Sequence, residues 1–518
     1  MAQEEDPRIL ELRELRAKAR KGGGDDRVAK QHAKGKLTAR ERIELLLDPG
    51  SFVELETFAV QQQDPLGLGD EKYLGDGVVT GYGLVDGRTV YVYAQDFTIQ
   101  GGSLGEMQGT KICRTMDLAV RAGCPVVGLI DSGGARIQEG VYSLRGYAEI
   151  FKRNAQYSGI IPQISVIMGP CAGGASYSPA LTDFIIMVEK QSFMFLTGPE
   201  VIKTVTGEII DQESLGGAAA HLAMSGLASL TAPSDQEALV TVRKLLSYLP
   251  SNNVDDVPAA ACEDDIMRAD EELNHLVPVD PSIPYSMHEA IELIVDRGSF
   301  FELQTTFATN AIIGLARMGG ESVGIISQEP SNMAGVMDID ASDKICRFVR
   351  LCDSFNLPIV TFLDCPGFLP GSEQEHRGII RHGAKVLFAY AESTVPRVSI
   401  ITRKAYGGAY IVMSSKPMGS DINFAWPSAE IAVMGPEGAA NILFGKQIKA
   451  AADPEAERAR IIEDYRKRFL NPYAAAGADV IDDVIEPKET RFRVITALTA
   501  LKNKYIATLP RKHGNMPV

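Results

Sequence analysis

The 518-residue sequence has no long hydrophobic run, no sustained basic stretch and no closely spaced pair of cysteines. Without eighteen consecutive apolar residues there is no ordinary transmembrane helix, which needs about 20 of them to span a bilayer. The 67 acidic residues outnumber the 52 basic ones, and the net charge of −15 disfavours binding to the phosphates of nucleic acids. Seven cysteines, an odd number with no CxxC spacing, argue against a disulfide framework and against a zinc ribbon.

The N-terminal stretch, residues 1–26, mixes acidic with basic side chains, which is typical of neither a signal peptide nor a transit peptide. The overall composition, 45% hydrophobic and 23% charged, is that of an ordinary globular protein. We therefore expect a cytoplasmic protein that binds neither membranes nor nucleic acid. Its length predicts two or three domains, at about 100–200 residues for each.

The sequence contains an internal repeat, which sets the number of domains. Residues 43–55 (IELLLDPGSFVEL) match residues 291–303 (IELIVDRGSFFEL), 248 positions further along the chain. Three more matches follow in the same order at offsets of 233 or 234, namely 111–114 with 344–347, 125–131 with 358–364, and 162–175 with 396–409. The repeat predicts two halves that share one fold.

The stretch between the two halves is rich in proline and acidic residues and has no apolar period, which is typical of a linker. We predict an N-terminal domain over residues 1–255, a linker over residues 256–284 and a C-terminal domain over residues 285–518.

Each half alternates short apolar runs with amphipathic stretches. The apolar runs are continuous, which predicts an α/β fold whose mostly parallel strands are buried on both faces and flanked by helices. We predict strands over 125–130, 163–168, 359–363 and 398–401, and helices over 107–121 and 342–355. Near the N-terminus, residues 8–20 read as an amphipathic helix, and Thr38 with Glu41 forms a capping box before a further helix that Pro49 ends.

A glycine pair follows a predicted strand in each half, Gly173-Gly174 in the first and Gly407-Gly408 in the second. A strand, a glycine turn and a helix N-terminus together aim backbone N–H groups at one point, with the positive end of a helix dipole behind them. Such a nest suits a developing oxyanion, for example the enolate of a thioester. The alternative is that the glycines only tighten strand–helix packing. Two pairs at equivalent positions favour binding, and they would serve a reaction between two carbonyl-bearing reactants.

Longer motifs surround these glycines and identify a family. They are Gly35–Asp48 (GKLTARERIELLLD), Asp131–Gly140 (DSGGARIQEG), Gly169–Pro179, Phe362–Gly371 (FLDCPGFLPG), Gly378–Lys385 (GIIRHGAK), Arg403–Tyr410 (RKAYGGAY), Ala425–Gly435 and the terminal Lys512–Asn515. Over essentially its whole length the chain resembles the carboxyltransferase (β) subunit of biotin-dependent acyl-CoA carboxylases, the propionyl-CoA and acetyl-CoA carboxylase group.

The resemblance implies two crotonase-like halves, each a βαβ-rich spiral, in a homo-hexamer whose active sites lie between the first half of one subunit and the second half of another. It implies that Gly173 and Gly174 form the oxyanion hole for the thioester oxygen of acyl-CoA. Gly408 and Ala409 would form the hole for the ureido oxygen of biotin.

The resemblance also implies the mechanism and the cofactor. Carboxybiotin releases CO2, the biotin enolate removes the α-proton of acyl-CoA, and the thioester enolate attacks the CO2, so that the protein supplies positioning and electrostatics. The chain has neither a biotinyl-lysine tetrapeptide nor a GxxxxGK[ST] loop. We therefore expect biotin to be carried by a separate α chain that also holds biotin carboxylase, and we expect no metal in this chain.

Several further side chains are candidates for substrate binding, among them Ala175 and Tyr410 beside the two glycine pairs. Ile411 falls where the family lines its acyl pocket and where several propionyl-CoA-specific members have aspartate, so an apolar residue suggests a broader acyl choice that includes acetyl-CoA; plain core packing is the alternative. Arg136 either meets a phosphate of CoA or pairs with a carboxylate such as Glu139.

Arg403 and Lys404 either counter the acidity of the ligands or form a structural salt bridge. His382 is a lone histidine, and a structural hydrogen bond is the favoured reading.

Three other functions compete with this interpretation. The carboxyltransferase subunit of a methylmalonyl-CoA decarboxylase or of a transcarboxylase would share the same motifs. A serine hydrolase is a remote alternative, because Gly101–Gly105 matches GxSxG with Ser103 at its centre, although no buried apolar strand directly precedes it. A non-enzymatic scaffold would not need two glycine nests.

Overall fold

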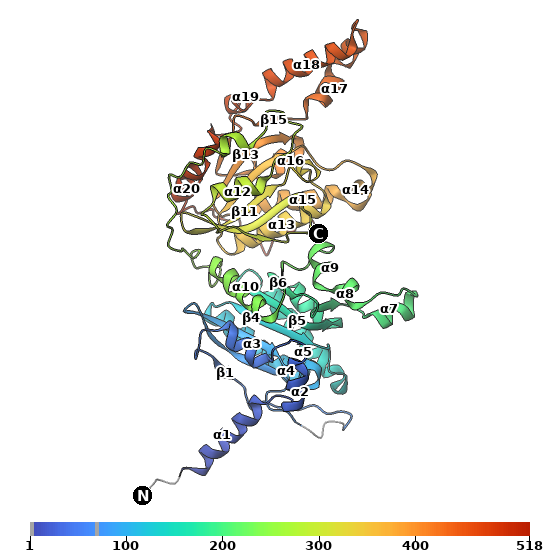
Figure 1. The fold of residues 1–518 in the computed structure, drawn as a ribbon, viewed down its shortest axis with the longest axis vertical. Helices are drawn as coiled ribbons and strands as arrows, with labels where there is room; N and C mark the ends of the chain where they lie inside the picture. Colours follow the sequence, from blue (N-terminus) through green and yellow to red (C-terminus); the bar gives the residue numbers. More distant parts are fainter. Residues whose placement is uncertain (1–4, 68–71, 518) are drawn as a thin grey trace. The chain divides into compact units, whose positions relative to one another are not determined.

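The computed structural model describes residues 5–67 and 72–517 of the chain. It divides into two compact units, Met1–Asp255 and Asp256–Val518, each built on one eight-stranded sheet (Figure 1). No helix in the described part of the chain is long and apolar enough to cross a membrane.

The sheet of the first unit runs in the order β1-β2-β3-β4-β5-β6-β8, and β7 pairs with β5 beside this path. The first three strands are antiparallel to one another, and from β3 onward the neighbours are parallel. The strands are β1 (Val53–Leu55), β2 (Val78–Val85), β3 (Arg88–Gln95), β4 (Val126–Ser132), β5 (Gln163–Ala172), β6 (Phe184–Val188), β7 (Phe193–Phe195) and β8 (Leu230–Ala232).

The sheet of the second unit has the same topology, β9-β10-β11-β12-β13-β14-β16 with β15 paired to β13. Each strand therefore has a counterpart in the first unit, as the internal repeat predicts. The strands are β9 (Phe301–Leu303), β10 (Ala311–Met318), β11 (Glu321–Gln328), β12 (Ile359–Cys365), β13 (Arg397–Tyr406), β14 (Ile422–Ala425), β15 (Glu430–Ala432) and β16 (Asp483–Val484).

Helices flank both sheets (Figure 1). In the first unit they are α1 (Pro7–Arg20), α2 (Asp25–His32), α3 (Ala39–Leu46), α4 (Glu106–Ala122), α5 (Val141–Tyr157), α6 (Tyr177–Ala180), α7 (Pro199–Thr206), α8 (Gln212–Gly216), α9 (Ala218–Ala223) and α10 (Asp235–Tyr248). In the second they are α11 (Leu273–Leu276), α12 (Met287–Ile294), α13 (Ile339–Ser354), α14 (Ser372–Arg377), α15 (Ile379–Glu392), α16 (Gly407–Val412), α17 (Pro436–Ala450), α18 (Pro454–Phe469), α19 (Pro472–Gly477) and α20 (Thr490–Ala500).

The predicted local elements are confirmed. All seven residues of β4 and of β12 are buried, which is why both strands read as continuous apolar runs. The capping box is present, with the Thr38 side chain accepting from the Glu41 N–H and the Glu41 side chain accepting from the Thr38 N–H. The amphipathic helix near the N-terminus is α1, where Ala19 is the one buried side chain.

A register shift in each sheet determines where the glycine pairs lie. The pairing of β4 with β5 shifts between Ile130 and Ser132, and that of β12 with β13 shifts between Leu363 and Cys365. Before the shift, β5 pairs with β6; after it, Pro170–Ala172 pairs with the short strand β7. After the shift β5 still pairs with β4, at Ser132 and Cys171, and its last residues lead directly into the first glycine pair.

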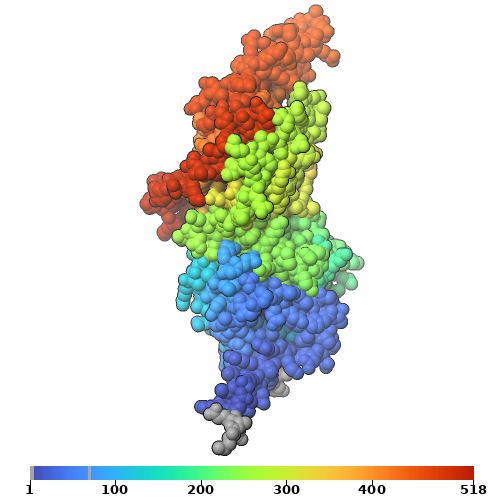
Figure 2. Space-filling view, turned by 60° about the vertical axis from the view of Figure 1, so that its left-hand side comes forward, coloured from blue at the N-terminus to red at the C-terminus, as the bar shows by residue number. Residues whose placement is uncertain are grey.

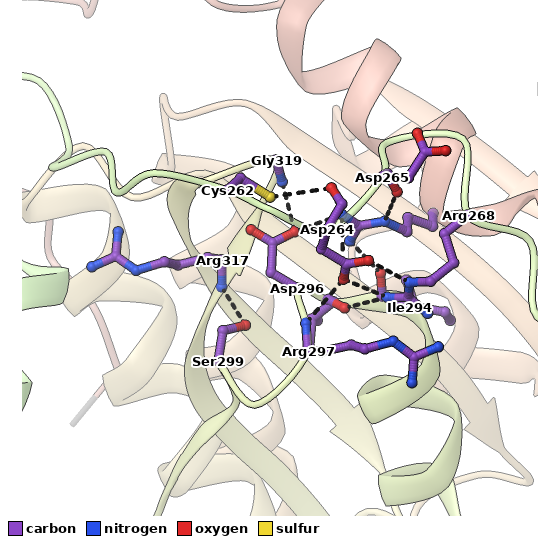
Figure 3. A network of polar contacts seen from close by, with 12 residues as sticks. Cys262, Asp264, Asp265, Arg268, Ile294, Asp296, Arg297, Ser299, Arg317 and Gly319 are labelled. Atoms are coloured by element: carbon purple, nitrogen blue, oxygen red, sulfur yellow. Dashed lines mark hydrogen bonds and ion pairs between the residues drawn. The ribbon is translucent and has the colours of Figure 1, made fainter.

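Residues 256–284, predicted as a linker, are counted within the second unit and pack against it. Ala259 forms a bridge with Glu321, and Arg268 donates to the carbonyl oxygen of Val295 at 2.7 Å while pairing with Asp264 at 2.8 Å (Figure 3). Charged side chains and backbone carbonyls hold the first part of the segment. Further along, Leu273 is only 1% exposed and belongs to the core of the second unit, and Leu276 and Val277 pack against that core.

Two helical projections stand away from the sheets. In the second unit α17 and α18 form an arm that extends from the body of that unit (Figure 1, Figure 2). In the first unit α1 projects in a similar way, and its apolar residues Ile9 and Leu10 are each 44% exposed.

Candidate functional site

The two glycine pairs have the same backbone geometry. Gly173 has φ +64° and opens the 3₁₀ turn η3 (Gly173–Ser176), which continues into α6. Gly407 has φ +58° and opens α16. A positive φ suits glycine, and in both halves it turns the chain from the end of a long strand into the first turn of a helix. The first N–H groups of such a turn have no partner within the helix and are free to meet an anion.

The second glycine of each pair is exposed and has open space in front of it. A Cβ built on Gly174 would meet no described atom within 4 Å, and one built on Gly408 would approach the Phe368 ring no closer than 3.9 Å. Protein packing therefore does not require glycine at either position. This weakens the alternative that the pairs only tighten strand–helix packing. The assignment of Gly173, Gly174, Gly408 and Ala409 as oxyanion donors stays a prediction.

An apolar cavity of about 380 Å³ opens beside the second pair. It is lined by Phe368, Glu375, Ile379, Ile380, Gly383, Ala384, Leu387, Gly408, Ile411 and Val412. Ile411 is 46% exposed, so it is not a core residue. Sequence reasoning found Gly408 and Ile411 but missed the opposite wall from α15; the GIIRHGAK motif was the signal that pointed to it.

Two other predicted substrate-binding residues have structural roles in this chain. Ala175 is buried, and its side chain faces the core of the first unit. The Tyr410 hydroxyl donates to the carbonyl oxygen of Val480 at 3.1 Å, which ties α16 to the segment before β16.

Arg136 is fully buried, and its pairing is the ionic one that the sequence allowed. Its Nη1 lies 2.6 Å from Asp76 and 2.7 Å from Glu139, and its Nη2 donates to the carbonyl oxygen of Ser103 at 3.0 Å. Burial raises the pKa of Asp76, and the Arg136 charge opposes this rise. The guanidinium thus cross-links the loop after β4 to two neighbouring loops, and this buried position leaves it no exposed surface for a CoA phosphate.

Of the two cations beside the second glycine pair, Arg403 has a structural role and Lys404 is accessible. Arg403 is buried and its Nε lies 2.9 Å from Asp364, which is the structural salt bridge that the sequence allowed. Burial raises the pKa of Asp364, and Arg403 opposes this rise. The side chain of Lys404 is partly exposed, while its N–H donates to Asp364 at 3.1 Å.

Ser103 and His382 are both engaged in local structure. The Ser103 hydroxyl donates to the carbonyl oxygen of Gln100 at 2.8 Å, and the residue follows the turn η1 (Gln100–Gly102) rather than a strand. His382 Nδ1 lies 2.8 Å from Asp343, which also accepts from Lys385 at 2.9 Å. Neither arrangement is a nucleophile–base pair. Among the described residues no group of three or more His, Cys, Asp or Glu side chains is placed to hold a metal ion.

Comparison with known proteins decides the family. The model of the carboxyl transferase domain matches residues 30–516. The chain belongs to the carboxyl transferase family. Propionyl-CoA carboxylase carboxyltransferase subunit of Haloferax mediterranei is 56% identical over 99% of both chains, and methylmalonyl-CoA decarboxylase subunit alpha of Propionigenium modestum is 52% identical over the same shares.

Solved structures agree with the carboxyl transferase assignment. A crystal structure of the transcarboxylase 12S hexamer, with methylmalonyl-coenzyme A and methylmalonic acid bound, superposes with a TM-score of 0.97 at 49% identity. It covers 100% of this chain and 99% of that one. The predicted family resemblance, the α/β fold with two crotonase-like halves, and the carboxyltransferase activity are confirmed.

Proposed function

We propose that this carboxyl transferase is the subunit of a biotin-dependent acyl-CoA carboxylase that moves a carboxyl group from carboxybiotin to the α-carbon of propionyl-CoA, acetyl-CoA or both. The observation that carries the proposal is the pair of equivalent, exposed glycine nests, at Gly173-Gly174 and Gly407-Gly408, in a chain of this family. A transfer between two carbonyl compounds needs one oxyanion site for each.

The second nest fits a biotin ring. The ring is small and mostly apolar with one carbonyl oxygen, and the cavity beside Gly408 is apolar, about 380 Å³ in volume and bordered by the N-terminus of α16. The N–H groups of Gly408 and Ala409 would hold the carbonyl oxygen, and Ile411 with Phe368 would contact the apolar edges. When bound, carboxybiotin supplies the carboxyl group and the base for the transfer.

The first nest would hold the acyl-CoA thioester. The N–H groups of Gly173 and Gly174 would donate to the thioester oxygen and stabilise its negative charge as the α-proton leaves, which is the kind of electrostatic stabilisation that preorganised backbone donors provide. The chain's own contribution is thus to bind and orient two carbonyl oxygens. No acid–base pair of side chains is needed in this scheme.

The carrier of biotin and the assembly belong to the same proposal. We infer a separate α chain that holds biotin carboxylase and the biotin carrier. We also infer a homo-hexamer, because the transcarboxylase 12S structure is described as a hexamer assembly and this chain resembles that subunit over its whole length.

A decarboxylase or transcarboxylase subunit is the second candidate. Methylmalonyl-CoA decarboxylase subunit alpha of Propionigenium modestum and transcarboxylase 12S are 52% and 49% identical to this chain, against 56% for the propionyl-CoA carboxylase subunit. These values are too similar to separate the reactions. The partner chain separates them, since a biotin carboxylase makes the reaction ATP-driven carboxylation.

The test uses the purified chain with methylmalonyl-CoA or malonyl-CoA, with and without free biotin, and follows CO2, acyl-CoA and free thiol. Biotin-dependent loss of the carboxyl group with the thioester intact is the expected result, and the better substrate identifies the acyl preference. Release of free thiol without biotin would contradict the proposal and would favour hydrolysis at Ser103.

A further inference from the structure

One buried aspartate stands at the register shift in each half of the chain. Asp131 lies between Ile130 and Ser132, where the pairing of β4 with β5 shifts, and Asp364 lies between Leu363 and Cys365 in the equivalent place. Both carboxylates are 0% exposed. Beyond the shift the strands stay paired in a new register, Ser132 with Cys171 and Cys365 with Ala405, and the last residues of β5 and β13 lead into the glycine nests.

In the second half the carboxylate holds the strand that carries the nest. Asp364 accepts from the N–H of Lys404 at 3.1 Å and from Nε of Arg403 at 2.9 Å, so one carboxylate binds two successive residues of β13. Arg403 also donates to the carbonyl oxygen of Ile283 at 2.8 Å and lies 4.8 Å from the centre of the Tyr285 ring. The nest begins at Gly407, three residues after Lys404.

In the first half the same strand positions cannot make these contacts. The residue equivalent to Lys404 is Pro170, which has no N–H to donate, and the residue equivalent to Arg403 is Gly169, which has no side chain. The donors come from elsewhere. Lys36 Nζ lies 2.8 Å from Oδ1 of Asp131, and Arg42 Nη1 lies 2.9 Å from Oδ2.

Gly169 leaves the space in which Lys36 reaches Asp131. A Cβ built on Gly169 would lie 1.9 Å from Oδ1 of Asp131 and 2.5 Å from Nζ of Lys36. Arg42 completes the link, because its Nη2 donates to the carbonyl oxygen of Met168 at 3.1 Å, directly before Gly169. Lys36 and Arg42 belong to the GKLTARER stretch, for which the proposed function has no other role.

We propose that Asp131 with Lys36 and Arg42, and Asp364 with Arg403, are positioning residues that set the two glycine nests, and that the segment Lys36–Arg42 is therefore part of the machinery of the first nest. This role rests on the proposed function of the nests in carboxyl transfer. All five side chains are buried. Each acts through the strand, because a movement of the strand at the register shift is carried along three residues to the amides of the nest.

Four variants test the proposal in the full-length chain. Lys36→Met removes the ammonium but keeps most of the apolar stem, and Gly169→Ala pushes the Asp131 carboxylate away from the strand. Arg403→Met removes the cation in the second half, and Arg403→Lys keeps a cation beside Asp364. Lys502→Met and Gly445→Ala are the matched controls, since Lys502 is 60% exposed and a Cβ on Gly445 meets nothing within 4 Å.

The first measurement is amide hydrogen exchange in the folded state, followed by mass spectrometry. Lys36→Met and Gly169→Ala are expected to speed exchange at least tenfold in the peptide around residues 170–177 and to leave the peptide around residues 404–411 unchanged. Arg403→Met should do the reverse, and Arg403→Lys should restore slow exchange. Uniform acceleration in both peptides, or none in either, would overturn the proposal.

The second measurement is the kinetics of biotin-dependent decarboxylation. Removing one oxyanion donor costs ~10²–10³ in kcat, so a misplaced nest should lower kcat at least tenfold while the KM for the CoA substrate changes less than threefold. A purely structural role would instead lower the melting temperature without a local change in exchange. If the wild-type chain shows no carboxyl transfer but the exchange pattern is as expected, the proposed function fails and the positioning role stands.

Discussion

The two halves of the chain contain the same ion pair in two different environments. In the first half Arg243 donates to the carbonyl oxygen of Leu46 and pairs with Asp48, both at 2.8 Å. In the second half Arg491 donates to the carbonyl oxygen of Ile294 at 3.0 Å and pairs with Asp296 at 2.8 Å. All three positions differ by 248 residues, so the internal duplication copied the whole arrangement.

The environments differ because the preceding segments differ. The Arg491 side chain is 1% exposed, and the carbonyl oxygens of Asp265 and Asp264 accept from it at 3.0 and 3.4 Å. The Arg243 side chain is 26% exposed, because the equivalent stretch of the first half is α1, which projects away. One ion pair has become part of a buried network, and its copy has stayed near solvent.

The largest expected effect comes from removing these two arginines. Arg491→Met leaves Asp296 buried without its cation, and breaking a buried pair in this way costs about 3–5 kcal/mol. Arg243→Met should cost about 1 kcal/mol or less, as is usual for pairs near the surface. Urea unfolding followed by fluorescence of Trp426 reports the second unit, because this single tryptophan is buried there. Calorimetry follows the unfolding of both units, so it also measures the loss that Arg243→Met causes in the first unit.

Lys502→Met, which removes an exposed pair with Glu321, is the control for losing a cation from the second unit. Equal losses for Arg491→Met and Arg243→Met would show that the burial of Arg491 does not determine the strength of the pair.

The next effect tests whether the two nests are equivalent. Gly174→Val and Gly408→Val each place a branched side chain at a position where a Cβ meets no described atom closer than 3.9 Å. We expect biotin-dependent carboxyl transfer to fall ~10²-fold or more in both, about 3 kcal/mol, with little change in melting temperature. Gly445→Val is the control, because its Cβ also meets nothing within 4 Å but lies on α17. Activity retained by either nest variant would show that its glycine pair is not part of the active site.

A smaller effect is expected at the apolar cavity beside the second nest. Ile411→Asp places a carboxylate in the apolar cavity beside Gly408. The acyl group must reach the biotin ring that we propose for this cavity, and differences of fit are worth ~1–3 kcal/mol. We therefore expect the ratio of kcat/KM for propionyl-CoA and acetyl-CoA to change about tenfold. Tyr177→Phe, at the equivalent position of the first half, serves as the comparison. An unchanged ratio in Ile411→Asp would show that the acyl group does not contact Ile411.

Much of this fold is predictable from the sequence because the repeat is visible in it. The matches at residues 43–55 and 291–303 predict two copies of one topology, and the continuous apolar runs predict β4 and β12 within two residues. The exposed glycine of each nest is predictable as well, because a strand, a glycine pair and a helix start follow one another directly in the chain.

The contacts between distant segments are not predictable in the same way. Lys36 reaches Asp131 across 95 positions, and nothing near either residue in the sequence indicates the pairing. The sequence left either a CoA phosphate or a carboxylate such as Glu139 as the partner of Arg136. Only the fold shows that Arg136 pairs with both Asp76 and Glu139. The packing of residues 264–268 near Arg491 was not predicted, because these residues are held through charged groups, which have no apolar period.

The smallest effect compares a titratable residue with a permanent charge. His288 contacts Glu302 at 3.0 Å and Glu329 at 2.9 Å, and these two hydrogen bonds raise its pKa to about 9. The equivalent residue of the first half is Arg40, which binds Glu54 through two hydrogen bonds and stays charged at any ordinary pH.

Because the pKa of His288 is higher in the folded protein than in the unfolded chain, its contribution to stability is fully present below about pH 6.5 and is lost as pH rises through about 9. The side chain is 41% exposed, so after solvent screening we expect a loss of about 1 kcal/mol for the second unit. Unfolding in urea at pH 6.5 and at pH 9.5, followed by Trp426 fluorescence, measures this loss. His288→Arg copies the first half and should remove this loss. If His288→Arg loses as much stability as the wild type between these two pH values, the titrating group lies elsewhere in the second unit.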